Sequence, residues 1–158
     1  IAILWALFVS RGKSFALLTA YLAGSAVVQF LKHFIFGQAA RPVKWFELNR
    51  IIVELPEGLV VSHWNSFPSG HSATAITLLF FLACQIQHQP LRLFLGLLTI
   101  LAGYSRIYLY MHFPEDVLAG MLIGIVAAIP LILLWERWLN HPERKHLNRP
   151  FLKWKRTV

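Results

Sequence analysis

The feature that most constrains this chain is a series of long apolar runs separated by short polar breaks. Hydrophobic residues make up 57% of the 158 residues and charged residues only 14%, which is too apolar for an average soluble domain. Crossing a bilayer takes a helix of about 20 apolar residues. Four runs are read as full spans, at residues 14–36, 71–87, 91–109 and 114–135, and a shorter one covers residues 1–9. We therefore expect an all-α, multi-pass transmembrane helix bundle of four full spans plus a truncated N-terminal helix.

The charge distribution predicts how this bundle is oriented. The net charge is +8, and seven of the fifteen Lys and Arg residues lie within residues 137–158, directly after an apolar run. Such a cluster is typical of a positive cytoplasmic flank rather than a nucleic-acid-binding face, so no nucleic acid partner is expected. We divide the chain into a membrane-embedded domain, residues 1–136, and a basic cytoplasmic tail, residues 137–158. The single cysteine, Cys84, excludes an internal disulfide framework.

The unusual polar residues all fall at one side of the predicted membrane. Because each crossing reverses sides, the end of the first span shares a surface with the start of the second, and the end of the third with the start of the fourth. Arg11, Lys13, Arg92 and the tail occupy the other surface, which the positive-inside rule makes cytoplasmic. The polar cluster then faces outward, at the outer side of a bacterial inner membrane. Its members are Lys32, Arg41, Ser69, Gly70, His71, Arg106, His112 and Asp116.

Ionisable residues at membrane depth are costly, so this cluster is a candidate functional site. One interpretation is a metal site built from His112, Asp116 and His71. Against it, Asp116 is the only aspartate in the chain and the cluster contains three cations. Cations, a helix start near Gly70 and neutral imidazoles suit an anion, above all phosphate. We therefore expect no metal and no cofactor.

The histidines of the cluster suit phosphoryl chemistry. His112 and Asp116 are four residues apart, a spacing that lets a carboxylate orient an imidazole around a helix start. An imidazole held in this way can attack phosphorus, and His71, at another helix start, can protonate the departing alkoxide.

Three motifs give the chain a resemblance to the type-2 phosphatidic acid phosphatase superfamily of membrane lipid phosphatases. Pro68-Ser69-Gly70-His71 matches its second motif. Its third motif is Ser-Arg, then His after five residues and Asp after three more, and Ser105, Arg106, His112 and Asp116 match this spacing without a gap. The family's first motif is a Lys followed, after six residues, by Arg-Pro. Lys32 and Arg41-Pro42 are similar to it, but here eight residues lie between Lys32 and Arg41, so the two extra residues must bulge. The resemblance implies that His112 is the nucleophile, Asp116 its orienting partner and His71 the general acid. It implies phosphate binding by Lys32, Arg41, Ser69, Gly70 and Arg106.

The expected function is therefore that of a membrane lipid phosphatase that hydrolyses a lipid phosphomonoester or diphosphate through a phosphohistidine. Its partners would be the lipid phosphate substrate and membrane lipids. Two alternatives stay open: a phosphoryl transferase between lipid carriers, which would use the same residues, and a non-catalytic phospholipid-binding protein. Family members usually have six membrane helices, so the resemblance also implies that this chain is a fragment. Residues 51–61, in the polar segment before the second span, are expected to form a short strand or an interfacial helix.

Overall fold

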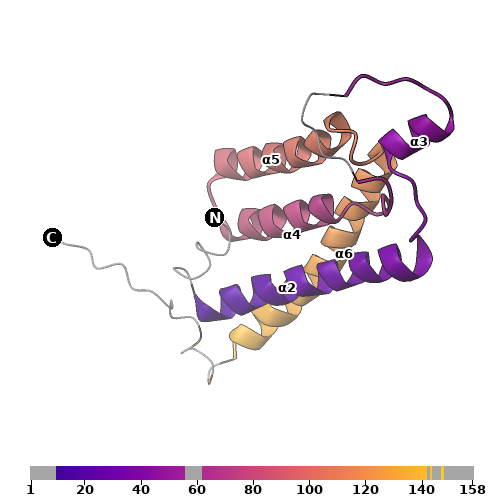
Figure 1. The fold of residues 1–158 in the computed structure, drawn as a ribbon. Coiled ribbons are helices and arrows are strands. Elements are labelled where there is room, and N and C mark those ends of the chain that lie inside the picture. Colours follow the sequence, from indigo (N-terminus) through magenta and orange to yellow (C-terminus); the bar gives the residue numbers. More distant parts are fainter. Residues whose placement is uncertain (1–9, 56–61, 142, 144–146, 148–158) are drawn as a thin grey trace, which may run out of the picture.

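The computed structural model describes residues 10–55, 62–141, 143 and 147. The predicted helix at residues 1–9 and most of the predicted tail lie outside the described residues. Within the described part the chain is helical and has no β-strand, which confirms the helical class. The elements are α2 (Arg11–Phe30), the π-helical segment η1 (Leu31–Ile35), α3 (Pro42–Leu48), α4 (Gly70–Gln85), α5 (Gln89–Tyr108) and α6 (Pro114–Leu139), as drawn in Figure 1.

Three of the four predicted spans have the length and hydropathy of membrane-crossing helices. They are α2 continued by η1, then α5 and α6, with 25, 20 and 26 residues. Helix α4 is apolar but has only 16 residues. At a rise of about 1.5 Å per residue it is shorter than the roughly 30 Å hydrocarbon core. The described structure therefore supports a helical membrane bundle, but it does not confirm the count of four full spans.

Local sequence signals set where the long helices begin. Ser69 caps α4, since its hydroxyl accepts a hydrogen bond from the N–H of Ser72, and Pro114 is the first residue of α6, as the sequence predicts. Helix α2 begins before the predicted first span of residues 14–36. Ser10 is the N-cap of α2 and accepts a hydrogen bond from the N–H of Lys13, so the helix includes residues 11–13.

The long helices pack through small residues. In Figure 1, α2, α4 and α5 lie side by side and α6 crosses them obliquely. Helix α4 contacts the other three long helices, α6 most extensively. Gly120 and Gly124 of α6 lie where this helix meets α4. A Cβ at Gly124 would come within 2.6 Å of the carbonyl oxygen of Ala73, and one at Gly120 would collide with the carbonyl oxygen of Ser69. The backbones of α4 and α6 therefore touch at the start of α4.

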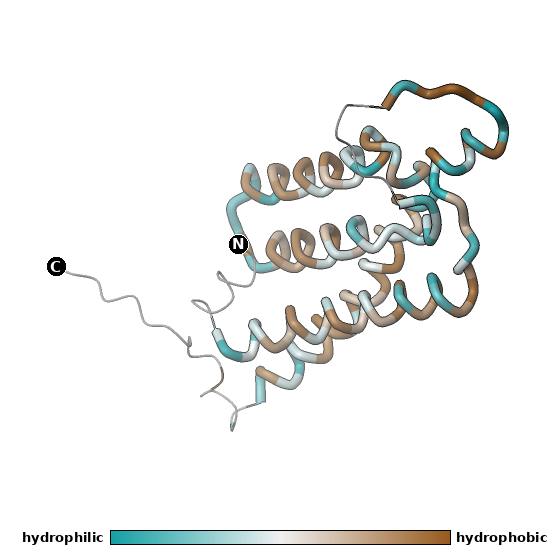
Figure 2. Tube along the Cα trace, in the orientation of Figure 1, coloured by the Kyte–Doolittle hydropathy of each residue, from teal (hydrophilic) through white to brown (hydrophobic). Residues whose placement is uncertain are grey.

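The helices are apolar outside as well as inside. The core is filled by side chains such as Leu17 and Phe81, whereas Leu118, Leu122 and Val126 on α6 are 62%, 64% and 69% exposed. Figure 2 shows hydrophobic colour along the middle of the helices and hydrophilic colour concentrated toward their ends. An apolar belt between two polar ends is what a lipid bilayer requires of a bundle's outer surface.

The connection between η1 and α4 differs from the prediction. Residues 51–55 form neither helix nor strand, and residues 56–61 lie outside the described residues. The short helix α3 was not predicted. It begins at Pro42 and packs on the turn between α5 and α6 through edge-to-face contacts of Trp45 with Phe113 and Phe46 with Tyr110. Aromatic contacts with a distant turn therefore hold this helix in place. Its seven residues are too few to show a helical pattern in the sequence.

Candidate active site

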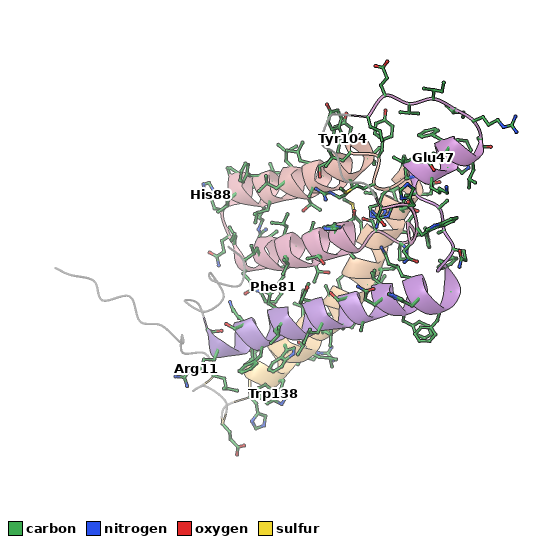
Figure 3. All side chains as sticks on the ribbon, viewed as in Figure 1. Arg11, Glu47, Phe81, His88, Tyr104 and Trp138 are labelled. Atoms are coloured by element: carbon green, nitrogen blue, oxygen red, sulfur yellow. The ribbon has the colours of Figure 1, made fainter. Side chains whose placement is uncertain are left out.

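The candidate site lies where the ends of four elements meet. The end of η1, the starts of α4 and α6 and the end of α5 gather at the end of the bundle that also holds α3 (Figure 1). Figure 3 labels Glu47 and Tyr104 toward this end, and Arg11 and His88 at the other. Seven of the eight predicted site residues stand on or close to these ends, and Arg41 is the N-cap of the nearby α3.

Lys32 and Arg41 face one cavity despite the two extra residues between them. The chain passes from α2 into the π-helical segment that contains Lys32, and Phe36 closes its last turn with an N–H bond of 2.8 Å to the carbonyl of Leu31. A π-helical turn takes up an extra residue, which is one form of the predicted bulge. Both cations line a cavity of about 540 Å³, together with Gly70 and His71 of α4.

The segment of residues 63–66 holds these two cations by its backbone. Lys32 Nζ donates to the carbonyl of Asn65 and Arg41 Nε to that of Trp64, both at 3.0 Å. The segment is itself attached to the chain before α3, through Arg41 N–H to the carbonyl of His63 (2.9 Å) and Ser66 N–H to that of Ala39 (3.0 Å). These bonds leave further donors on both cations for a ligand. No pattern in the sequence predicts these backbone contacts.

His112 and Asp116 form a buried pair. His112 is 2% exposed and Asp116 is 3% exposed, and His112 Nδ1 lies 3.6 Å from Asp116 Oδ2. This distance is slightly longer than a hydrogen bond, and His112 Nδ1 has no hydrogen-bond partner among the described residues. Catalytic hydrogen bonds are often long before substrate binds and shorten in the complex. The geometry therefore directs Nδ1 toward the carboxylate and leaves Nε2 as the other reactive ring nitrogen.

The surroundings of His112 favour its neutral form. Burial lowers the pKa of His112 below its ordinary value, and the nearby Arg41 and Lys32 lower it further. The Asp116 carboxylate opposes this by raising the pKa, but it does not outweigh burial. A neutral imidazole has the free electron pair that a nucleophile needs.

Asp116 is held from two sides. Its Oδ2 accepts a hydrogen bond of 2.8 Å from the N–H of Phe113, at the start of α6, and one of 2.5 Å from the hydroxyl of Ser66. Ser66 is buried, and sequence reasoning gave it no role. Fifty residues separate it from Asp116, so no spacing could have indicated the contact.

The start of α4 contributes His71 and Gly70 to the cavity. His71 is exposed and lies within electrostatic reach of Arg106, His112, Lys32 and Arg41. A Cβ at Gly70 would meet only Val28, at an ordinary 3.5 Å, so packing within the chain does not require glycine there. The first-turn N–H groups of α4 carry the partial positive charge of a helix start, which favours an anion.

Ser69 and Arg106, which the resemblance predicts to bind phosphate, lie outside the cavity lined by Lys32 and Arg41. The N–H of Ser69 donates to the carbonyl of Asp116 (2.9 Å), and its buried hydroxyl accepts from both the N–H and the hydroxyl of Ser72. The half-buried Arg106 bonds Ser105 Oγ at 3.2 Å and contacts Met111 Sδ at 3.7 Å, and its carbonyl accepts the N–H of His112. Neither residue lines the cavity of Lys32 and Arg41, so direct phosphate binding by them stays a prediction.

The donor set of the site suits an oxyanion. In the described part of the chain no three His, Cys, Asp or Glu side chains are grouped as metal ligands. The cavity is lined instead by two cations, a helix start and an accessible imidazole, and the buried imidazole paired with a carboxylate lies within electrostatic reach of both cations. This combination can bind a phosphate, attack its phosphorus and protonate a leaving oxygen.

Comparison with known proteins places the chain among phosphatases. The family model described as the PAP2 superfamily matches residues 13–140. The chain is 40% identical over 58 residues to the lipid A 4'-phosphatase of Bacteroides thetaiotaomicron, 37% of this chain and 26% of that protein. It is 34% identical over 76 residues to the putative undecaprenyl-diphosphatase YbjG of Escherichia coli, 46% of this chain and 36% of the relative. With phosphatidylglycerophosphatase B of Bacillus subtilis the identity is 36% over 73 residues, 39% and 34% of the two chains.

A solved structure extends the likeness to most of the fold. The crystal structure of Aquifex aeolicus LpxE superposes with a TM-score of 0.67 at 32% identity, covering 83% of this chain and 73% of that one. The matched regions of the three curated relatives span only 26% to 36% of their own lengths. The likeness therefore covers the helices and the site described above, and the curated relatives are longer than the stretch they share with this chain.

Proposed function

Because the chain belongs to the PAP2 superfamily, we propose that it is the catalytic part of an integral membrane lipid phosphatase. The observation that carries the proposal is the buried His112, with Nδ1 facing Asp116, beside a cavity lined by Lys32 and Arg41. Its substrate is a lipid phosphomonoester or diphosphate. The printed names of the relatives, a lipid A 4'-phosphatase, an undecaprenyl-diphosphatase and a phosphatidylglycerophosphatase, support this class.

The proposed reaction has two steps. Lys32 and Arg41 bind the phosphate oxygens, and His112 Nε2 attacks phosphorus while its Nδ1–H is held by the Asp116 carboxylate. The bond from phosphorus to the lipid oxygen breaks, and His71 gives that oxygen its proton. Neutral His71 then takes a proton from water, whose oxygen attacks the phosphohistidine, and inorganic phosphate leaves as His112 regains its electron pair. The cations and the start of α4 stabilise the charge that develops on the phosphoryl oxygens.

The proposed placement puts this site at the outer surface of a bacterial inner membrane. Arg11, Lys13 and Arg92 stand at or near the opposite end of the bundle from α3, which supports a cytoplasmic assignment of that end. In this arrangement residues 1–136 form the membrane-embedded domain and residues 137–158 the cytoplasmic tail. Helix α6 reaches Leu139, so it extends a few residues into the tail.

The proposal is tested with the full-length protein in detergent, by phosphate release from phosphatidate, phosphatidylglycerol phosphate, polyprenyl diphosphate and lipid A. We expect release from at least one of them. A radioactive phosphate ester should also give an acid-labile, base-stable label on the wild-type protein. His112→Ala should abolish this label, and His71→Ala should slow both its formation and its hydrolysis.

The matched control is His33→Ala, because His33 is exposed and adjacent to Lys32. Among the described residues its side chain bonds only the carbonyl of Gln29, one turn earlier in α2. This variant should label like the wild type. A chelator should have no effect, and vanadate, which mimics a pentacoordinate phosphoryl group, should inhibit. Label that survives His112→Ala would assign the nucleophile elsewhere. Transfer of phosphate to a second lipid without release of free phosphate would identify a transferase, and activity lost to a chelator and restored by zinc or magnesium would favour a metal site.

A further inference from the structure

Ser66 joins two parts of the candidate site that have so far been described separately. Its hydroxyl donates to Asp116 Oδ2 at 2.5 Å, a length typical of a hydroxyl bonded to an ionised carboxylate. Ser66 also ends the segment of residues 63–66, whose backbone carbonyls accept from Lys32 and Arg41. Its N–H attaches that segment to the carbonyl of Ala39, before α3. The side chain of Ser66 therefore contacts the buried pair of His112 and Asp116, and its backbone belongs to the segment that binds Lys32 and Arg41.

We propose that Ser66 is a positioning residue whose hydroxyl fixes the Asp116 carboxylate toward His112 and thereby couples the phosphate-binding cations to the nucleophile. This inference rests on the function proposed above. Asp116 Oδ2 receives the Phe113 N–H along the start of α6 and the Ser66 hydroxyl from another segment. Two donors from different elements hold Oδ2 from two directions and thereby restrict the rotation of the carboxylate.

Burial makes this contact specific. Ser66 is 1% exposed and Asp116 is 3% exposed, so water does not compete for the carboxylate. Replacing the hydroxyl removes a donor that no solvent molecule readily replaces, while the backbone N–H of residue 66 still reaches Ala39. An alanine at this position therefore separates the two functions. It disturbs the orientation of Asp116 but leaves the segment that holds Lys32 and Arg41 attached.

The experiment measures kcat and KM of Ser66→Ala and Ser66→Thr in the full-length protein. The probe is p-nitrophenyl phosphate, which follows the phosphoryl chemistry without depending on which lipid is the substrate. By analogy with outer partners of metal ligands, we expect Ser66→Ala to lower kcat by about 10- to 100-fold, with KM unchanged. Ser66→Thr retains the hydroxyl and should recover most of the lost kcat. In an Asp116→Ala background, Ser66→Ala should have no further effect, because the two residues act through one contact.

The matched control is Thr77→Val. Thr77 is also buried, and its hydroxyl bonds the carbonyl of Gly124 at 3.2 Å between α4 and α6, away from the site. It should keep the wild-type kcat, because loss of a buried hydrogen bond outside the site changes stability only. Thermal unfolding in detergent, measured for every variant, identifies a purely structural effect.

Three results would overturn the inference. They are a wild-type kcat in Ser66→Ala, kcat losses that multiply in the Ser66→Ala, Asp116→Ala double variant, and a loss that follows unfolding and is not restored by Ser66→Thr. The proposed function fails in a different way, since a wild-type protein that releases phosphate neither from p-nitrophenyl phosphate nor from any lipid would contradict it directly.

Discussion

At the scale of single residues, Asp116 connects the two helix starts that carry the histidines. Its side chain accepts the N–H of Phe113 at the start of α6, and its carbonyl accepts the N–H of Ser69, the residue that caps α4. The carboxylate that faces His112 and the backbone that positions His71 thus belong to one residue. The distance between the two histidines therefore depends on the packing of α4 against α6 as well as on either side chain.

The pH dependence of activity follows from the environment of His112. In the proposed mechanism, attack on phosphorus requires the unprotonated imidazole of His112, and kcat/KM reports the pKa values of the free enzyme. Because burial holds the pKa of His112 below 6.5, we expect the acidic limb of the kcat/KM profile to fall below pH 6.5. The measurement is phosphate release as a function of pH, with variants compared on one substrate so that its own ionisation cancels.

Two substitutions should move this limb in opposite directions. The Asp116 carboxylate raises the pKa of His112, so Asp116→Asn should shift the limb to lower pH and reduce the rate, by up to about 10⁴-fold if the effect matches that in Ser-His-Asp enzymes. Arg41 lowers the same pKa, so Arg41→Gln should shift the limb to higher pH. Shifts of the same sign in both variants would show that the limb belongs to a group other than His112.

At the scale of elements, the contact between α4 and α6 depends on Gly120. A Cβ there would collide with the carbonyl oxygen of Ser69, the residue just before α4, whereas a Cβ at Gly96 on α5 would meet nothing within 4 Å. We expect Gly120→Ala to destabilise the protein by about 1–3 kcal/mol, as overpacking does, and to lower activity by displacing the start of α4. Gly96→Ala should be neutral or stabilise by up to about 1 kcal/mol, from helix propensity.

Thermal unfolding in detergent and phosphate release, measured side by side, check this pair of glycine substitutions. Equal stability of the two variants would contradict the close approach of α4 and α6. A Gly120→Ala protein with lower stability but wild-type activity would show instead that the start of α4 adjusts without moving His71 out of the site.

How far the sequence predicts this structure depends on whether a feature is local. The spacing of His112 and Asp116 along one helix start predicts their pairing, and the alternation of apolar runs predicts that Lys32 and His71 share one end of the bundle. The two extra residues after Lys32 predict a bulge, which the structure realises at least in part as a π-helical turn. These predictions need only periodicity, spacing and chain reversal.

The missed features all depend on contacts between distant segments. Helix α3 is fixed by aromatic contacts with the turn before α6, and Ser66 meets a carboxylate fifty residues away. The backbone carbonyls of Trp64 and Asn65 bind the two cations, and a carbonyl is present at every position whatever the residue. Neither composition nor spacing encodes such contacts, so they appear only once the helices are in place.

At the scale of the whole molecule, a wide apolar surface lies between two polar ends. Figure 2 shows the hydrophilic residues toward the helix ends. The end with the site carries Lys32, Arg41 and Arg106, and the opposite end carries Arg11, Lys13 and Arg92. Lys32 and Arg41 are half-buried and line the cavity, whereas at the opposite end Lys13 is half-buried and Arg11 and Arg92 are exposed. Under the proposed placement, Lys32 and Arg41 face the ligand cavity, and Arg11 and Arg92 lie at the end that would meet anionic headgroups of the cytoplasmic leaflet.

This difference predicts the topology, which single cysteines can test. The background is Cys84→Ser, because Cys84 is exposed and would itself react. Gln38→Cys places a thiol at the site end and His88→Cys places one at the opposite end, and both positions are exposed. An impermeant thiol reagent should label Gln38→Cys in intact cells and His88→Cys only after the membrane is permeabilised, because the positive-inside rule places Arg92 and the basic tail in the cytoplasm. The opposite pattern would put the site on the cytoplasmic side, and labelling of both in intact cells would contradict a bundle whose two ends lie on different sides of the membrane.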